Sequence, residues 1–441
     1  MTSDSKSTSS ASSSASRRSA TPNEPGSSIV PASSSGDLMS FFKGILSFTG
    51  DLSSLTCPSF LLNGISLLEY GAHWSDYPHV LAEITKATDS AERMKLVARW
   101  FVSTLYGSYN KRVAESNTGE KKPFNPILGE QFLASWNDGE FGETKFVCEQ
   151  VSHHPPVSAI YFENAKAGIY GSGHFSQKSK FKGTTMKVVQ EGRVTLRMSN
   201  TDEVFCLTLP NLNICSILTG KPFLEMSDTT YIRSTSGYTA EFQWLAKSWF
   251  YGEYHKFTGS IFKDPEPTYT QNGPGQELLF SMKGKWVADS YVVDEKTGAE
   301  SVLFDVKAQP PADMIIKPVE KQSELESRRV WNKVSEALAS GNYDVASKEK
   351  TAIEEKQRAL RRERAEANVE WKPSLFTWID DADGEEAVRK CYAYLFSAKE
   401  SVGTGSWVYN ASPRKAVSKP TPQQSGSQTP SDAFSTAQSS I

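Results

Sequence analysis

The middle of the chain, residues 130–307, is the part that most constrains the fold. It contains many short stretches with the alternating, β-branched and aromatic character of strands, for example at 145–148, 193–198 and 241–244. Turn signals separate such stretches at 137–139, 191–192, 236–237 and 296–298. Many short strands at near-regular spacing favour a closed or nearly closed antiparallel sheet.

Helical periodicity flanks this strand-rich region on both sides. Residues 37–48 place apolar side chains at i, i+3, i+4, i+7 and i+8, and residues 90–116 carry a broad apolar face. After Pro318 the pattern is helical again to about residue 399. The expected fold class is therefore α+β, mainly β, with a barrel-like core and helical N- and C-terminal flanks.

The two ends of the chain have a different composition from the body. Residues 1–36 and 401–441 are rich in Ser, Thr, Ala, Gly and Pro. Such segments bury too little apolar surface to offset the entropy of ordering them, so both are predicted to be disordered tails. The folded body is then 37–400, with no linker or internal repeat inside it.

Charge, cysteines and hydropathy exclude several classes of protein. The net charge of −3 gives no overall attraction to nucleic acid. Five widely spaced cysteines without a CxxC pair favour neither a disulfide framework nor a zinc site, and fit a reducing compartment. No secretory signal and no apolar run of about 20 residues is present in the sequence. We therefore expect a cytoplasmic protein that visits membrane surfaces peripherally.

The most distinctive string is residues 149–156, Glu-Gln-Val-Ser-His-His-Pro-Pro. Its simplest interpretation is a strand that ends at a Pro-Pro break with two exposed histidines. Zinc binding fits poorly, because adjacent strand residues point to opposite faces and no third ligand has a suitable spacing. GxSxG, P-loop and HExxH motifs are absent from the sequence, so a nucleophile or metal hydrolase has no support. A remaining possibility is that His153 and His154 together bind an anion such as phosphate.

Three further segments each allow a functional and a structural interpretation. The stiff segment 119–130 holds Lys122, although such loops are usually only solvated. Lys350, Glu354 and Arg358 lie at steps of four on one helix face, where they could bind an anion or form ordinary i,i+4 ion pairs. The amphipathic stretch 37–48 is either packed permanently on the core or a lid over an apolar cavity.

The string at 149–156 closely resembles the signature of the oxysterol-binding protein family. Other segments resemble family motifs in the same order along the chain: 122–130 (KPFNPILGE), 50–55, 317–318, 325–328, and the helix with Lys350, Glu354 and Arg358. The similarity covers about residues 37–375. The chain is similar to a short, single-domain member of fungal type.

The resemblance implies an incomplete antiparallel β-barrel around a lipid tunnel that an N-terminal lid closes. Family members exchange lipids between membranes, typically a sterol against phosphatidylinositol 4-phosphate, without catalysis, cofactor or metal. The implied divisions are a lid at 37–57, a helical part at 58–118, the barrel at 119–307 and C-terminal helices at 308–400. The implied location is cytoplasmic, with peripheral association at Golgi or endoplasmic reticulum membranes.

The resemblance also assigns residues to these roles. The cationic and imidazole side chains that would bind the inositol phosphates are Lys122, His153, His154, Lys350 and Arg358. Glu354 would orient them, and the remaining headgroup contacts would come from Phe124, Asn125, Leu52, Ser53, Ser54, Leu55, Thr56 and Cys57. The lid would seal the tunnel with Leu38, Phe41, Phe42 and Ile45.

The tunnel floor departs from the family pattern. Ser108-Tyr109 stands where sterol-handling relatives often carry Gln followed by Tyr, and Arg112 is retained. A serine hydroxyl reaches less far than a glutamine amide, so the resemblance implies a phosphoinositide more strongly than a sterol. The expected partners are these two lipids and, transiently, a membrane surface, but no nucleic acid, and the protein is expected to be a monomer. Alternatives are a phosphoinositide sensor or membrane tether, a lipid hydrolase, and a β-rich scaffold.

Overall fold

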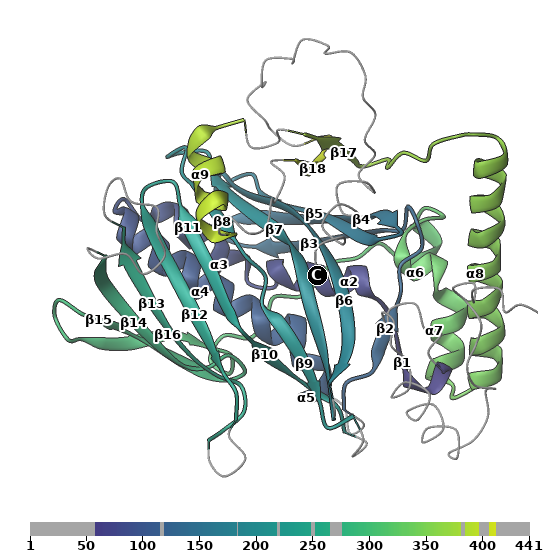
Figure 1. Cartoon of the computed structure of the whole chain (residues 1–441), viewed down its shortest axis with the longest axis horizontal. Helices are drawn as coiled ribbons and strands as arrows, with labels where there is room; N and C mark the ends of the chain where they lie inside the picture. Colours follow the sequence, from purple (N-terminus) through teal and green to yellow (C-terminus); the bar gives the residue numbers. More distant parts are fainter. Residues whose placement is uncertain are drawn as a thin grey trace, which may run out of the picture.

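The computed structural model describes residues 58–114, 119–182, 184–217, 221–247, 252–264, 276–380, 384–396 and 405–411. The predicted lid (Leu38, Phe41, Phe42 and Ile45), the segment from Leu52 to Cys57 and the N-terminal tail lie outside these residues. The described chain consists of one large curved sheet, with helices against one of its faces and a separate helical group at one end (Figure 1).

The large sheet has 14 antiparallel strands. They are β3 (Gln131–Asp138), β4 (Gly142–His153), β5 (Pro156–Asn164), β6 (Ile169–Lys182), β7 (Thr185–Met198), β8 (Val204–Leu207), β9 (Asn211–Cys215), β10 (Phe223–Ser227), β11 (Thr229–Ser234), β12 (Tyr238–Leu245), β13 (Lys256–Lys263), β14 (Glu277–Lys285), β15 (Asp289–Asp294) and β16 (Glu300–Asp305). The main path runs from β16 to β3, and β9 and β10 branch from β7. Among the described residues the edge strands β3 and β16 do not pair with each other, which confirms the predicted incomplete barrel.

The helices between the chain's first described residues and the sheet lie against its inner face. They are α2 (Leu67–Gly71), η3 (Ala72–Ser75), α3 (Pro78–Glu83), η4 (Ile84–Lys86), α4 (Ser90–Tyr109) and α5 (Lys111–Ala114). The Asp89 side chain caps α4 by accepting from the Glu92 amide at 2.9 Å. Residues 90–114 confirm the predicted helical segment, with a break at Asn110.

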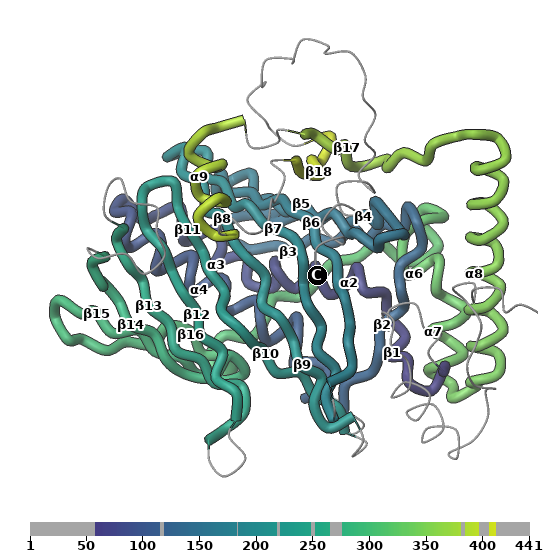
Figure 2. Tube along the Cα trace, viewed as in Figure 1, coloured from purple at the N-terminus to yellow at the C-terminus, as the bar shows by residue number. Residues whose placement is uncertain are grey.

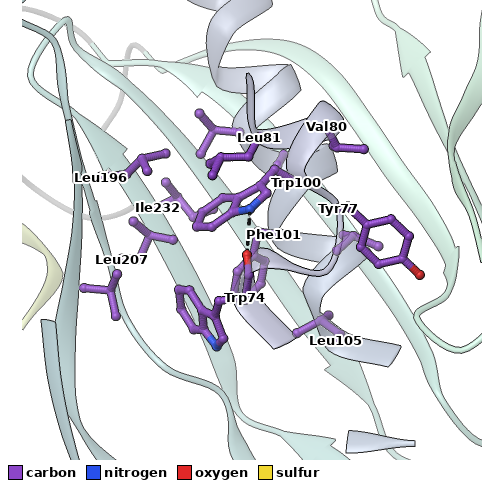
Figure 3. Close-up of a cluster of buried hydrophobic side chains, with 14 of the residues drawn as sticks. Trp74, Tyr77, Val80, Leu81, Trp100, Phe101, Leu105, Leu196, Leu207 and Ile232 are labelled. Atoms are coloured by element: carbon purple, nitrogen blue, oxygen red, sulfur yellow. Dashed lines mark hydrogen bonds between the residues drawn. The ribbon is translucent and has the colours of Figure 1, made fainter. Parts of the chain in front are cut away.

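The main core lies between α4 and the sheet. Figure 3 shows Trp100 and Phe101 of α4 among Leu196, Leu207 and Ile232 from the strands, all of them fully buried. The Trp100 indole Nε1 donates to the carbonyl of Trp74 at 3.2 Å, so this large side chain is both buried and satisfied. The inner face of the barrel is thus packed along much of α4.

The C-terminal helices form a second group beyond the sheet. It contains η6 (Val319–Lys321), α6 (Ser327–Val330), α7 (Asn332–Ala339) and α8 (Tyr343–Glu366), joined by η2 (Ser59–Leu61), β1 (Leu62–Ser66) and β2 (Lys122–Phe124). Figure 2 shows the first described residues, in purple, next to the green chain of α7 and α8. A separate cluster of apolar side chains from β1, the segment 124–127, α7 and α8 holds this group together.

Several predicted boundaries are wrong because they depend on pairing between distant segments. Residues 58–118 were expected to be helical, but β1 is a strand that pairs in parallel with β2, about 60 residues later. For the same reason β2 belongs to this small two-stranded sheet and not to the barrel. A turn was predicted at 191–192, but β7 continues through Gly192, where a Cβ would overlap the His174 carbonyl oxygen. Glycine there permits close approach of two strands.

The C-terminal part also differs from its prediction. Residues 308–400 were expected to be helical, yet β17 (Phe376–Ile379) precedes the helix α9 (Glu386–Leu395). Residues 401–441 were expected to be disordered, yet β18 (Ser406–Tyr409) pairs with β17. Phe376 and Trp407 are buried against the face of β4 and β5, and this packing outweighs the polar composition around them.

Candidate functional site

The histidine string forms the tight turn between β4 and β5, and its own polar side chains hold the turn. The Ser152 hydroxyl donates to the Pro155 carbonyl at 2.7 Å, and the side-chain Nε2 of Gln150 donates to the Ser152 carbonyl at 2.9 Å. The His154–Pro155 peptide is cis. The ring centroids of His153 and His154 lie 4.8 Å apart. The two imidazoles are therefore fixed side by side at the end of the sheet.

The lysine-bearing segment lies directly against this turn. The Gly129 amide donates to the Gln150 carbonyl at 2.9 Å, and the Gln150 amide donates to the Glu130 carbonyl at 2.8 Å. The His153 ring donates a hydrogen bond to the backbone carbonyl of Pro126. Nearby, Lys122 Nζ donates to Asn125 Oδ1 at 2.6 Å. The structure thus brings residues 126–130 against the histidine turn, and Lys122 and Asn125 directly precede them in the chain.

Helix α8 supplies the third part of the site. Only 9% of the surface of Lys350 is exposed, and its ammonium group pairs with the carboxylate of Glu354. Arg358 Nη2 lies 3.9 Å from Glu354 Oε2. On the same helix Ala346 and Ile353 pack into the cluster that contains Phe124. This apolar contact fixes α8 beside the lysine-bearing segment. A buried ammonium group is costly unless it is compensated, and the carboxylate of Glu354 compensates Lys350 in this structure.

Charged side chains of α8 contribute to the pKa shifts of the two histidines. Burial, followed by the neighbouring His154 and by Arg361, lowers the pKa of His153 to about 4, while the hydrogen bond to Pro126 and the carboxylate of Glu354 oppose this shift. Burial and then Arg361 lower the pKa of His154. Nδ1 of His153 is buried and has no hydrogen-bond partner among the described residues. At neutral pH both rings are therefore neutral, and Nδ1 of His153 can still form a hydrogen bond.

Arg361 is a further cationic residue close to the turn, and the sequence motifs described above do not include it. It lies one turn beyond Arg358 and two turns beyond Glu354 on α8, so the helical spacing alone could have placed it on the same face. With Lys122, Lys350 and Arg358 it gives four cationic groups on the two segments that meet the histidine turn, and Glu354 lies among those of α8. Such a surplus of positive charge suits a multiply charged anion.

Other residues of the predicted motifs have packing roles. The Phe124 ring is fully buried and stacks on Trp331 with centroids 4.5 Å apart. Its side chain therefore packs in the apolar cluster beside α7 and α8 and is not open to a ligand. The Glu149 carboxylate is buried and accepts from the amides of Ser374 and Leu375 at 2.9 and 2.8 Å. It ties the start of the histidine string to the C-terminal segment.

The residues assigned to the tunnel floor lie at the end of α4. Ser108 is buried and its Oγ has no partner among the described residues, while the Tyr109 hydroxyl accepts from Gln190 Nε2 at 3.1 Å. Arg112 donates to the Gly107 and Ser108 carbonyls and stacks over the Tyr70 ring. Arg112 therefore caps the C-terminus of α4 by binding its last carbonyl groups. Ser108, Tyr109 and Arg112 thus form a cluster of polar side chains that is separate from the histidine turn.

Neither a metal-binding cluster nor a membrane-spanning helix is found among the described residues. Within those ranges no three or more His, Cys, Asp or Glu side chains are grouped so that they could hold a metal ion. None of the helices in the same ranges is long and apolar enough to cross a membrane.

Comparisons with known proteins gave consistent matches. A family model described as oxysterol-binding protein matches residues 38–337 and 335–410. Protein KES1 of Mycosarcoma maydis is 39% identical, over 77% of this chain and 88% of its own length, and protein kes1 of Schizosaccharomyces pombe is 37% identical, over 84% and 92%. The solved Osh1 ORD domain in complex with ergosterol has a TM-score of 0.65 and 21% identity, covering 87% of both chains. The Osh3 ORD of Saccharomyces cerevisiae in complex with PI(4)P has a TM-score of 0.58 and 22% identity, covering 79% of this chain and 88% of its own.

Proposed function

The chain belongs to the oxysterol-binding protein family, and on that basis we propose that it carries lipids between membranes. In this proposal one interior binds either a sterol or phosphatidylinositol 4-phosphate, and the two exchange by mass action. The observation that carries the proposal is the convergence of β4, the 122–130 segment and α8 around the histidine turn.

The headgroup would bind at this convergence. A phosphate monoester carries nearly two negative charges and three acceptor oxygens, which suit Lys122, Lys350, Arg358 and Arg361. His153 and His154 would donate to the same phosphate, and Glu354 would keep its basic neighbours in position. Each charged hydrogen bond would contribute about 1.5–3 kcal/mol. Asn125 and the segment from Leu52 to Cys57 are proposed to complete the headgroup contacts.

The lipid tails require a dry interior. Exposing one methylene to water costs about 0.8 kcal/mol, so neither a sterol nor a diacyl chain can cross an aqueous gap unprotected. We propose that the incomplete barrel provides the interior and that residues 37–57 close it as a lid. The polar group at Ser108, Tyr109 and Arg112 would then lie at the inner end, where a sterol hydroxyl could find a partner.

Relatives support both ligand classes, since one solved neighbour holds ergosterol and another holds PI(4)P. Exchange of this kind makes and breaks no covalent bond, so the protein is proposed not to be an enzyme. It would act in the cytoplasm at membrane surfaces. A phosphoinositide sensor or tether that binds the headgroup without shuttling is the second candidate, because it would use the same histidine turn.

The test is transfer between two liposome populations. Donor liposomes carry phosphatidylinositol 4-phosphate, acceptor liposomes carry ergosterol or cholesterol, and the protein is added at a catalytic amount. We expect both lipids to move in opposite directions, and native mass spectrometry of the protein to show one lipid per chain. Headgroup binding without net movement of either lipid would support the sensor and contradict transfer.

The low pKa of His153 predicts that binding depends on pH. In the free protein the ring is neutral at pH 7 because its pKa is about 4, and the pKa of His154 is also lowered. A bound phosphate would raise both values, since an adjacent negative charge favours the protonated ring. Binding then takes up protons, and affinity should rise as pH falls from 8 to 6.5, by up to about tenfold per pH unit for each proton taken up.

Calorimetric titration with water-soluble glycerophosphoinositol 4-phosphate, in two buffers of different ionisation enthalpy, measures both affinity and proton uptake. His154→Asn is the matched variant, because asparagine keeps a donor but cannot titrate. It should bind with a weaker pH dependence. An affinity that is constant or falls towards pH 6.5, with no proton uptake, would contradict the role of the histidines.

A further inference from the structure

The β6–β7 hairpin carries a cluster of lysines near its turn. Side chains alternate along a strand, so Lys178, Lys180 and Lys182 share one face of β6. Lys187 of β7 lies directly opposite Lys180 and joins the same face. We call these four residues the lysine face. From 178 to 188 the chain contains these four lysines and no acidic residue.

The lysine face is unfavourable for the isolated fold. Like charges directly opposite each other on neighbouring strands destabilise a sheet. Lys178 is compensated by Glu191 at 2.8 Å and Lys187 by Asp228 at 2.9 Å. Lys180 and Lys182 are exposed and form no ion pair within the part of the chain that the structure describes. Two ammonium groups thus lie together near the hairpin turn, without an internal partner of opposite charge.

The other face of the same hairpin end is apolar. Phe181 and Met186 face each other across the two strands and are only half-buried. Met186 also lies opposite Ile214 of β9, and the next residue on this face, Val188, belongs to the main core. The hairpin end therefore has cationic side chains on its outer face and apolar side chains on its inner face, at the lower edge of the molecule in Figure 1.

We propose that this end of the hairpin docks on an anionic phospholipid surface. Lys180 and Lys182 would contact the headgroups, while Phe181 and Met186 enter the boundary between headgroups and acyl chains. Basic residues are attracted to anionic leaflets, and an apolar side chain beside them adds buried area. An acidic protein segment would match the lysines but leave the apolar pair unused, so the lipid surface fits better. The lysine face also explains how a chain of net charge −3 binds an anionic surface, because the attraction is local.

The experiment is co-sedimentation of the full chain with vesicles of phosphatidylcholine containing 30% phosphatidylserine, without phosphoinositide or sterol. Removing two basic residues from the contact, as in Lys180→Ala/Lys182→Ala, should weaken partitioning by about 10- to 30-fold. Phe181→Ser should weaken it by a smaller factor, and 0.5 M salt should reduce the difference between the natural chain and the lysine variant. Vesicles of phosphatidylcholine alone should bind the natural chain and the variants equally weakly.

The matched control is Lys296→Ala/Lys307→Ala, which removes the same charge from exposed lysines at the β15–β16 end of the sheet. It should bind the phosphatidylserine vesicles as the natural chain does. Equal losses in both double variants would overturn the proposal, because the effect would then be one of net charge. Unchanged binding by Lys180→Ala/Lys182→Ala would overturn it as well. Because these vesicles contain no exchangeable ligand, the result is independent of the proposed lipid transfer.

Discussion

Replacing His153 and His154 together with alanine is expected to reduce extraction of phosphatidylinositol 4-phosphate from liposomes by at least about 100-fold. Two hydrogen bonds to the phosphate disappear, and each is worth about 1.5–3 kcal/mol when the phosphate is charged. The four nearby cations remain, but the imidazoles are the groups fixed in the turn, close to the charges of α8. Extraction is measured by sedimenting the liposomes and assaying the lipid in the supernatant.

The same double variant should keep its fold. His154 is exposed, and the variant loses only the hydrogen bond from His153 to Pro126, while Gln150 and Ser152, which hold the turn, remain in place. Thermal unfolding followed by circular dichroism should therefore change little. The matched control is His79→Ala, a half-buried histidine in α3 that should not affect extraction. Normal extraction by a folded His153→Ala/His154→Ala protein would refute the headgroup assignment.

The sequence predicted the architecture well where the signal is local. Strand alternation and turn residues indicated the barrel, and helical periodicity indicated α4 and α8. The errors lie where distant segments decide the structure. The strands β1 and β18 pair with segments 60 and 30 residues away, and the glycine at 192 serves strand contact, although glycine is equally typical of a turn.

The candidate site follows the same division. Family resemblance named His153, Lys122 and Lys350, and the structure brings their segments together through backbone bonds and apolar packing. The family resemblance could not separate ligand-facing residues from supporting ones within a motif. Phe124 and Glu130 belong to the same segment as Lys122, yet both are fully buried. Burial depends on the helices α6 to α8, which lie about 200 residues later in the chain.

Glu130 is the carboxylate on which this assembly depends. Oε1 accepts from the Ser66 hydroxyl and, at 2.8 Å, from the Ser327 hydroxyl. Oε2 accepts from the Ile127 amide at 3.0 Å and from the Trp331 indole at 2.9 Å. One buried side chain thus joins the start of α2, the 122–130 segment, α6 and the beginning of α7.

Replacing Glu130 with alanine should lower the free energy of unfolding by about 3–5 kcal/mol, because two N–H donors lose their acceptor and a cavity remains. Glu130→Gln is the matched variant. Its oxygen can accept from the amide and the indole, while its NH2 group donates to the two serine hydroxyls, which can also act as acceptors. We expect it to cost less than about 1.5 kcal/mol. Urea unfolding measures both, and equal losses would contradict the hydrogen-bond account.

The natural chain and the Glu130→Gln variant should also differ in how their free energy of unfolding depends on pH. Burial raises the pKa of Glu130 to about 7 from an ordinary 4.5, so the folded state favours the protonated acid. Its contribution to stability is full below pH 4.5 and is lost as pH rises towards 7. Glutamine does not titrate, so the cost of Glu130→Gln relative to the natural chain should shrink between pH 5 and pH 7. A cost that stays constant over this range would mean that the folded protein holds Glu130 as a carboxylate throughout, and would contradict the raised pKa. Because the same carboxylate anchors the segment that carries Lys122, the alanine variant should lose headgroup binding together with stability, whereas the glutamine variant should keep it.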